Sequence, residues 1–548
     1  MTDGEDPILK TSHLERAVIL ALAAGYAVWA GLFILQSSYV AIDGQRYFGL
    51  FDDAMISMRY AWNFAHGLGL VWNAGERVEG YSNLLMTLVM SLPSLFLDKR
   101  LAVLAVQIVG IPTVLGTAWL ARRVAGEVSE GKPFRSLMGI LVFACVLLYY
   151  PLSSWTLMGM ETGLLALLIM ACAWFGLRWV SHARGADLTR MALAAGLAFL
   201  ARNDSLALSA VIFAYVSLVA CWRSRDRGKL FAIAHAAGLV ALFVLAQTAF
   251  RCAYYGELLP NTYFLKLTRY PLSVRLIDGG RFVLEFLGQT WPLFVLAGIA
   301  VWRGFRPERI FLSSLMLTAL AYQVYVGGDP WSTWRMIAPA MPALFILAAA
   351  GGVAFVLYIR RLAASRYALA VAALLTLIPL WFSDLPFLPD MAVRGPTSAA
   401  IANRTNTNAA IAINALTRPG ASVGVIWAGT LPYYVDRYAV DFLGKSDPYI
   451  ARLDADVSGS SGWGNQISIP GHNKYDLDYS IVQRRPTYAQ AFAWGYATVR
   501  PYFVENYARL EYHGAMGTKT VFLLKDSPLV CWEACQDEYR IIPWPEQK

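Results

Sequence analysis

Long apolar runs alternate with short polar connections along the first 384 residues of the chain. A helix needs roughly 20 apolar residues to cross the hydrocarbon layer of a membrane, and most of these runs approach that length. The pattern predicts a polytopic α-helical membrane protein with about eleven spans, of which the fifth is short. The predicted spans lie near residues 17–36, 101–121, 137–155, 163–180, 189–200, 205–221, 230–250, 287–302, 310–326, 336–359 and 367–384.

Basic residues are concentrated in every second connection between these runs, including "RSRDRGK" at 223–229 and "RGFRPER" at 303–309. Cytoplasmic loops of membrane proteins carry an excess of Lys and Arg, so this alternation predicts a cytoplasmic N-terminus. The apolar stretch 83–97 is short, and it would invert every later loop if it crossed the membrane. We therefore expect an in-plane or re-entrant helix there.

The composition of the chain changes after residue 384. "SVGVIWAG" at 422–429 and "KTVFLLK" at 519–525 are typical of strands and stand in a segment of soluble character. We expect a membrane module over residues 1–384 and a small outward-facing α/β domain over residues 385–548. The first outer loop of the membrane module would be residues 37–100.

Composition supports a membrane location and argues against other classes. Apolar residues make up 57% of the chain and charged residues 15%, whereas soluble domains carry about a quarter charged residues. The net charge of +9 is accounted for by the basic connections, so no nucleic-acid partner is predicted. The chain has neither a G-x-G-x-x-G nor a P-loop motif, and a nucleotide site is unsupported.

Two of the six cysteines, Cys531 and Cys535, lie in the soluble segment with three residues between them. This spacing allows a disulfide if the compartment is oxidising. No histidine cluster accompanies them, so a zinc site is not predicted. The other four cysteines stand in or beside apolar runs, where cysteine behaves as a small hydrophobe.

Two adjacent acids, Asp52 and Asp53, follow the first apolar run in "YFGLFDDAMISMRY" at 47–60. A carboxylate at a membrane surface is costly unless it is solvated, paired or bound to a metal. The residues that follow have helical spacing, so one acid serves adequately as a helix cap. The second acid needs another reason, and we interpret the pair as catalytic.

The predicted outer loops hold most of the remaining unusual polar residues. A single acid near the outer end of a helix is common, but several acids on one membrane face indicate a polar cavity. The cations beside them either bind a phosphate or extend their charged ends to the membrane interface. Aromatic residues in these loops either anchor the protein at the interface or stack on sugars. The predicted substrate-binding residues are Glu79, Glu161, Asp204, Asp329, Arg59, Arg202, Lys266, Arg335, Tyr81 and Asn261. We assign the phosphate to Lys266 and Arg335, with Arg202 in reserve. A divalent cation on Asp52 and Glu161 is the alternative.

Several stretches resemble the bacterial arabinofuranosyltransferases of the GT-C superfamily, which include mycobacterial terminal enzymes and type IV pilin arabinosyltransferases. The most specific match is the first outer loop, with the acid pair and "NAGERVEG" at 73–80. The other matching stretches are "GMET", "YYGELLPNTYFLK", "GGDPWSTWR" and "AGTLPYYVDRYAVDFLGKSDPYIAR". The resemblance extends over most of the chain.

The resemblance implies a GT-C fold in the bacterial inner membrane, with the catalytic site at its outer, periplasmic face. The implied donor is a polyprenyl-monophosphate sugar, decaprenyl-phosphate arabinofuranose in the nearest relatives, and the acceptor is a glycan or pilin hydroxyl. Asp53 matches the key acid of the family and Asp52 its neighbour, while Glu79 and Glu161 match acidic motif positions. "RNDS" at 202–205 departs from the Arg–Pro–acid–Gly form of the equivalent turn, so the resemblance assigns no role to Asp204.

Three readings of function stay open from the sequence. The first is an arabinofuranosyltransferase, and the second is a transferase for mannose or another pentose on the same kind of carrier. The third is a transporter or flippase for a lipid-linked glycan. A transporter would carry charge in the middle of broken, repeat-related spans, whereas this chain carries it at the outer ends. That placement favours chemistry at the membrane surface, with the bilayer as a partner of the protein.

Overall fold

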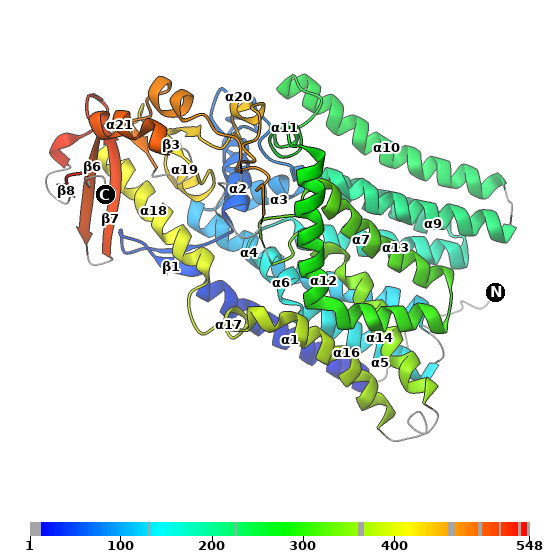
Figure 1. Ribbon diagram of the computed structural model, residues 1–548. Coiled ribbons are helices and arrows are strands. Elements are labelled where there is room, and N and C mark those ends of the chain that lie inside the picture. Colours follow the sequence, from blue (N-terminus) through cyan, green and yellow to red (C-terminus); the bar gives the residue numbers. More distant parts are fainter. Residues whose placement is uncertain are drawn as a thin grey trace.

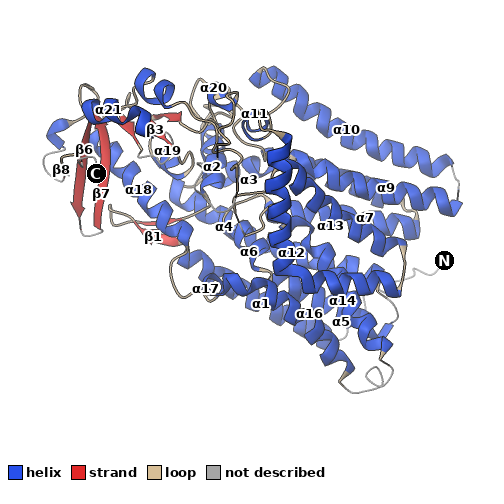
Figure 2. Ribbon diagram, in the orientation of Figure 1, coloured by secondary structure: helices blue, strands red, loops and turns tan. Residues whose placement is uncertain are grey.

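A computed structural model describes residues 13–129, 132–224, 227–331, 333–359, 367–458, 466–490, 496–514, 517–534 and 539–544. Long helices occupy most of the molecule, and a six-stranded sheet lies at one end (Figure 1). Figure 2 shows the same separation of helices and strands by colour. Cys535 is outside the described residues, so the disulfide that the spacing allows falls outside them too.

Within the described residues, nine helical segments are long and apolar enough to cross a membrane, or up to ten if one bent pair counts as a span. The bent pair is α5 (Lys132–Leu148) and α6 (Tyr150–Leu157), which meet at 52°. The span count is therefore below the predicted eleven. Each predicted region is nevertheless helical; the short fifth one is α8 (Gly185–Ala201), of 17 residues. The nine are α1 (His13–Gln36), α4 (Lys99–Val128), α7 (Thr162–His182), α9 (Leu206–Ser224), α10 (Arg227–Tyr255), α12 (Leu272–Arg303), α13 (Pro307–Val326), α14 (Met341–Tyr358) and α16 (Ala368–Asp384).

The bundle is organised around α14, most of which is buried, while α10 exposes most of its apolar surface. Residues such as Leu242 and Leu245 on α10 are 59% and 65% exposed, as expected for side chains that face lipid. Gly351 on α14 allows close packing, because a Cβ there would lie 1.9 Å from the Leu296 carbonyl oxygen of α12. The molecule is a multi-span membrane protein.

The first outer loop folds into a short hairpin and two helices. Strands β1 (Ser38–Val40) and β2 (Arg46–Phe48) pair in antiparallel fashion and lead into α2 (Asp52–Ala65). The stretch predicted as in-plane or re-entrant contains α3 (Leu84–Ser94), whose 11 residues are too few to cross the hydrocarbon layer.

The C-terminal segment contains a mixed sheet with the strand order β4-β3-β5-β7-β6-β8. Strand β3 runs parallel to both β4 and β5, and the other pairs are antiparallel. The two strands predicted from sequence are confirmed as β3 and β7. The strand bounds are β3 (Ser422–Val425), β4 (Tyr438–Asp441), β5 (Tyr488–Ala489), β6 (Tyr507–Gly514), β7 (Gly517–Leu524) and β8 (Tyr539–Ile541).

Short helices connect this sheet to the bundle. Helix α18 (Ser398–Leu416) packs against β1, where the hydroxyls of Tyr39 and Thr407 are 2.7 Å apart. Asn73 of the first loop exchanges two hydrogen bonds with the backbone of Ala439 in β4, at 2.8 and 3.1 Å. The remaining short elements are α11 (Asn261–Lys266), α17 (Leu388–Met391), α19 (Thr430–Tyr434), α20 (Pro448–Ala451) and α21 (Tyr496–Asn506).

Candidate active site

The adjacent acids Asp52 and Asp53 occupy the first turn of α2 and have different partners. Asp52 accepts hydrogen bonds from the backbone N–H groups of Thr430 at 2.9 Å and Gly429 at 3.2 Å, at the start of α19. Burial raises the pKa of Asp52 and outweighs the nearby positive charge of Lys445. The residue that precedes α2 is Phe51, so neither acid is its N-cap. Asp52 instead joins α2 to the C-terminal segment.

Asp53 lies between two cations that come from distant parts of the chain. Its Oδ1 atom is 2.8 Å from the Lys445 ammonium and its Oδ2 atom is 2.9 Å from the Arg335 guanidinium. Burial alone would raise the pKa of Asp53, but the charges of Lys445, Arg335 and Lys266 outweigh burial and hold this pKa well below its usual range. The carboxylate remains 24% exposed, so it is accessible from the adjoining space.

The loop that presents Lys445 is fixed by side chains around it. Asp441 accepts the backbone N–H groups of Leu443 at 3.0 Å and Ser446 at 2.7 Å. Asn261 donates to the carbonyl oxygens of Gly444 and Lys445 at 2.9 and 3.1 Å. Burial raises the pKa of Asp441 to about 6, although it accepts these N–H groups. The ammonium of Lys445 is thereby held at a defined position.

Arg335 is held in position by residues of the membrane module. Its Nε atom lies 3.0 Å from an oxygen of Asp329, and its guanidinium lies over the ring of Trp155 at 5.3 Å. The preceding residue, Trp334, has a positive φ of 54°, which is strained for a bulky residue. Its indole donates to Gln289 at 2.8 Å and packs against Phe282, contacts that maintain this backbone.

These residues line a cleft of about 260 Å³, here called the cationic cleft. Its four Lys or Arg side chains are Arg202, Lys266, Arg335 and Lys445. Among the described residues, the Lys266 ammonium has no hydrogen-bond or ion-pair partner, and burial lowers its pKa. Eight predicted site residues line the cleft: Asp53, Tyr81, Glu161, Arg202, Asp204, Lys266, Asp329 and Arg335.

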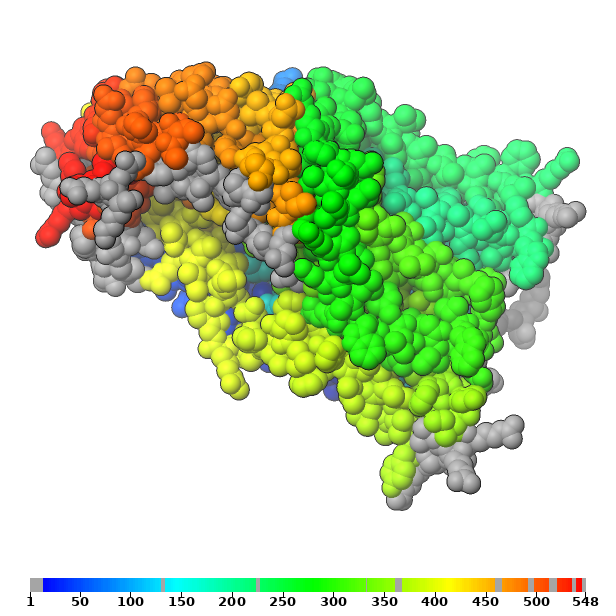
Figure 3. All heavy atoms as spheres, in the orientation of Figure 1, coloured from blue at the N-terminus to red at the C-terminus, as the bar shows by residue number. Residues whose placement is uncertain are grey.

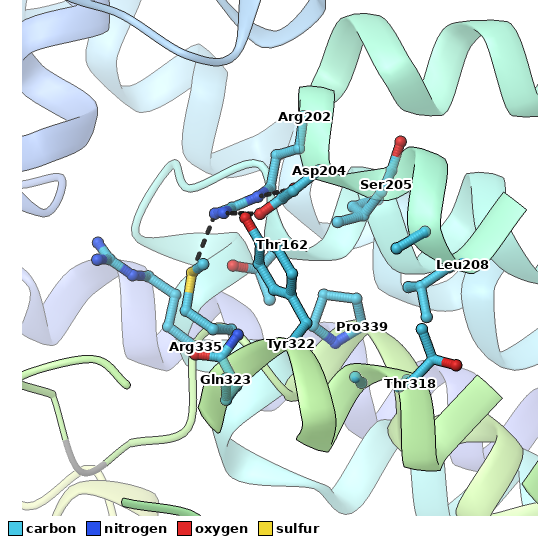
Figure 4. Close-up of a pocket in the computed structure, with 15 residues that line it drawn as sticks. Thr162, Arg202, Asp204, Ser205, Leu208, Thr318, Tyr322, Gln323, Arg335 and Pro339 are labelled. Carbon is cyan, nitrogen blue, oxygen red and sulfur yellow. Dashed lines mark hydrogen bonds and ion pairs between the residues drawn. The ribbon is translucent and has the colours of Figure 1, made fainter. Parts of the chain in front are cut away.

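Charge is unevenly distributed along the cationic cleft. At one end Arg202 faces two acids, because its guanidinium is 3.0 Å from Glu161 and 2.6 Å from Asp204. Figure 4, a close-up of a smaller pocket beside the cleft, shows Arg202 with Asp204 and its contact with a methionine sulfur. At the other end Lys266, Lys445 and Arg335 face the carboxylates Asp53 and Asp329. An anion is therefore favoured at the Asp53 end, and Arg202 has no spare charge to offer it.

Four predicted site residues lie outside the cationic cleft. Arg59 is buried beneath the C-terminal segment, where it donates to carbonyl oxygens of Trp72, Pro432 and Arg437. Glu79 forms a buried ion pair with Arg251. Asn261 supports the Lys445 loop, and Asp52 binds α19. These four have structural partners instead of facing the cleft.

The structure also brings two residues to the site that sequence reasoning did not select. Lys445 is the single cation in "AVDFLGKSD", where it stands between two aspartates, and this was the available signal. His472 lines the cationic cleft, and burial together with the charge of Lys445 lowers its pKa to about 3. Both belong to the C-terminal segment, more than 390 residues along the chain from Asp53.

The predicted metal ligands do not fit a shared cation site. Asp52 is engaged by two backbone N–H groups, and Glu161 by Arg202 and the Asn83 amide at 3.0 Å. Across the described residues, no group of three or more His, Cys, Asp or Glu side chains is arranged to hold a metal ion.

Comparison with solved structures is informative about the fold. The chain superimposes on ArnT from Cupriavidus metallidurans in the apo state with a TM-score of 0.54 and 16% identity, over 93% of this chain and 98% of that one. For the same protein bound to undecaprenyl phosphate the TM-score is 0.55 with 13% identity, over 94% and 99%. The fold is of the GT-C type.

Sequence comparison agrees with the resemblance noted from the first outer loop. The chain is 26% identical over 355 residues to the terminal β-(1→2)-arabinofuranosyltransferase of Corynebacterium glutamicum, over 57% of this chain and 47% of that protein. The chain thus spans about half the length of this curated relative. Residues 398–527 match a family model described as Domain of unknown function (DUF8728), a range that includes Lys445 and His472.

Proposed function

We propose that this protein is a glycosyltransferase that uses a polyprenyl-monophosphate sugar, D-arabinofuranose by its resemblance, and transfers the sugar to a hydroxyl of a glycan or pilin. The observation that carries the proposal is that Lys445 and Arg335 both pair with the Asp53 carboxylate, while the charge of Lys266 acts on it from the same cleft. Three converging cations match a phosphate group, and an adjacent carboxylate matches the base that an incoming hydroxyl needs.

The reaction breaks the bond between the anomeric carbon and the phosphate oxygen and forms a bond to the acceptor oxygen. Asp53 accepts the proton of the acceptor hydroxyl, and polyprenyl phosphate leaves with the electron pair of the broken bond. The three cations stabilise the charge that develops on the departing phosphate.

Donor binding would also prepare Asp53 for this role. In the structure the carboxylate is held by Lys445 and Arg335, and its lowered pKa makes it a weak base. A bound phosphate shares those cations, so the pKa of Asp53 rises towards its ordinary value. The base therefore becomes effective only when the donor is present.

The surroundings of the cleft suit a prenyl carrier. Tyr263 lines the cleft and is 38% exposed, and the nearby Leu258 and Leu259 are 67% and 40% exposed. Exposed apolar side chains beside the cleft are suited to contact a prenyl chain. We place the cleft at the periplasmic face of the inner membrane, with the N-terminus cytoplasmic and residues 385–548 forming the periplasmic domain.

The test is transfer of a radiolabelled pentose from a synthetic prenyl-phosphoryl arabinofuranose by the purified full-length protein. We expect transfer to an oligosaccharide or a pilin peptide, with release of prenyl phosphate, and the same assay with a mannosyl donor examines donor choice. Donor binding without any transfer would overturn the glycosyltransferase assignment. Movement of a lipid-linked glycan across liposomes without bond formation would identify a transporter instead.

A further inference from the structure

A second cavity, distinct from the cationic cleft, also has Asp53 in its lining. It has a volume of about 590 Å³ and lies between α18, the end of α1, α6 and the segment that follows β3. Figure 3 shows the surface hollowed beside the yellow α18 region, with blue and cyan atoms of the first loop and membrane module at its floor. We call it the tryptophan pocket, after Trp155, Trp331 and Trp427, which line it.

The tryptophan pocket and the cationic cleft meet at Asp53. Asp53, Trp331 and His472 line both spaces, so the carboxylate is reached from either side. Arg335 contacts residues of both spaces, because its guanidinium pairs with Asp53 and lies over the ring of Trp155, which lines the tryptophan pocket. A ligand in the tryptophan pocket would therefore approach the same carboxylate as a ligand in the cationic cleft.

The two spaces differ in charge. Four Lys or Arg side chains line the cationic cleft, whereas none is found among the described residues that line the tryptophan pocket. Among the described lining residues, the charged side chains are the acids Asp52, Asp53 and Asp390, and the ring of the buried His472 is neutral. A phosphate would be repelled there, so the occupant carries no negative charge.

Apart from these acids, the aromatic and amide side chains of the lining match a sugar. Phe51 stands edge-on to both Trp155 and Trp331, with ring centroids 4.8 and 4.9 Å apart, which forms an aromatic wall. Gln490 accepts the backbone N–H groups of Ile426 and Trp427 and donates to the Asn406 side-chain oxygen at 3.2 Å. The amide nitrogen of Asn406 has no partner among the described residues and can donate to a ligand hydroxyl. Aromatic faces beside amide donors and acceptors suit a neutral polyhydroxylated ligand.

We infer that the tryptophan pocket binds the acceptor, as a neutral glycan whose hydroxyl reaches Asp53 from the side opposite the donor phosphate. This inference rests on the proposed function and adds the class and location of the acceptor. The DUF8728 region supplies Asn406, Trp427 and Gln490, so it selects the acceptor, while Lys266 and Arg335 of the membrane module hold the donor.

The experiment is a pair of titrations on the full-length protein in detergent. One uses a neutral oligofuranoside, and the other uses prenyl monophosphate. The Asn406→Asp variant keeps an oxygen for Gln490 but loses the amide donor, and Trp427→Ala removes an aromatic face. We expect each to weaken oligofuranoside binding roughly 3- to 10-fold, in line with one lost neutral hydrogen bond or ring contact, and to leave prenyl-phosphate affinity unchanged.

Two further variants serve as controls. Lys266→Ala should weaken prenyl-phosphate binding alone, and Ile401→Ala, an exposed position on α18 outside the pocket lining, should change neither affinity. A phosphorylated form of the oligofuranoside should bind the wild type more weakly than the neutral form.

Absence of oligofuranoside binding, or binding that Asn406→Asp and Trp427→Ala leave intact, would overturn the acceptor site. So would a serine-containing peptide that binds through these residues in place of the glycan. Failure of the proposed function gives a different result: the wild-type protein would bind both ligands but transfer no sugar.

Discussion

The Lys445 ammonium lies 2.8 Å from Asp53, although 392 positions separate the two residues in the chain. This pair joins α2 of the membrane module to the loop after β4, and Arg335 completes it from the other side. Asp53 is thus the counter-ion of two buried cations. The first prediction concerns what happens when that counter-ion is removed.

Replacing Asp53 by Asn should abolish transfer and preserve donor binding. Loss of a well-placed general base costs roughly 10²- to 10⁴-fold in rate. Because the substitution also releases Lys445 and Arg335, prenyl monophosphate should bind at least as tightly as to the wild type. Single-turnover rates and donor titrations measure the two effects. Near-normal turnover of Asp53→Asn would move the base to another residue.

Replacing Asp52 by Ala should destabilise the contact between α2 and α19. The two N–H groups of Gly429 and Thr430 would lose their acceptor, which costs roughly 1–3 kcal/mol for a buried group. Asp52→Asn keeps one acceptor oxygen and should lose less. Both variants should bind prenyl monophosphate normally once folded. Thermal unfolding in detergent measures the midpoint temperatures, which should fall in the order wild type, Asp52→Asn, Asp52→Ala. An unchanged midpoint together with lost turnover would instead give Asp52 a chemical role.

Replacing Lys266 or Arg335 by Ala should weaken donor binding. A charge-assisted contact to phosphate contributes roughly 1.5–3 kcal/mol, which corresponds to about 10- to 150-fold in affinity. Arg269→Ala is the matched control, because Arg269 lies three positions from Lys266 and pairs with Asp454 in an exposed contact. If titration with prenyl monophosphate gives the same affinity for both variants and the control, the phosphate is held elsewhere.

His472 should make the protein less stable below about pH 6.5, the usual pKa of histidine in an unfolded chain. Its folded pKa is lowered to about 3, so between these values the unfolded state binds a proton that the folded state does not. Stability contributed by the neutral ring is therefore complete above pH 6.5 and falls as the pH drops, by about 2 kcal/mol at pH 5. Unfolding midpoints of wild type and His472→Gln at pH 7.5 and 5 test this. Equal losses in both proteins would contradict it.

The elements that could be predicted from sequence depend on local patterns. Apolar length predicts the helices, and the excess of acids in outer loops indicates a polar cavity, which contains Glu161 and Asp204. The separate partners of Asp52 and Asp53 could not be predicted, because adjacent residues on a helix point in different directions and only tertiary contacts identify their neighbours. Lys445 and Arg59 show the same limit: both are cations, but only packing places one at the cleft and buries the other.

The site also depends on when its parts are synthesised. Lys266 and Arg335 belong to segments that are made and inserted before the loop carrying Lys445 leaves the ribosome. Until then, Asp53 lacks one of its cations and the tryptophan pocket lacks Trp427 and Gln490. A nascent or truncated chain therefore has an incomplete site, so the proposed chemistry is restricted to finished molecules. Half-made copies of the protein would thus be unable to act on the proposed donor.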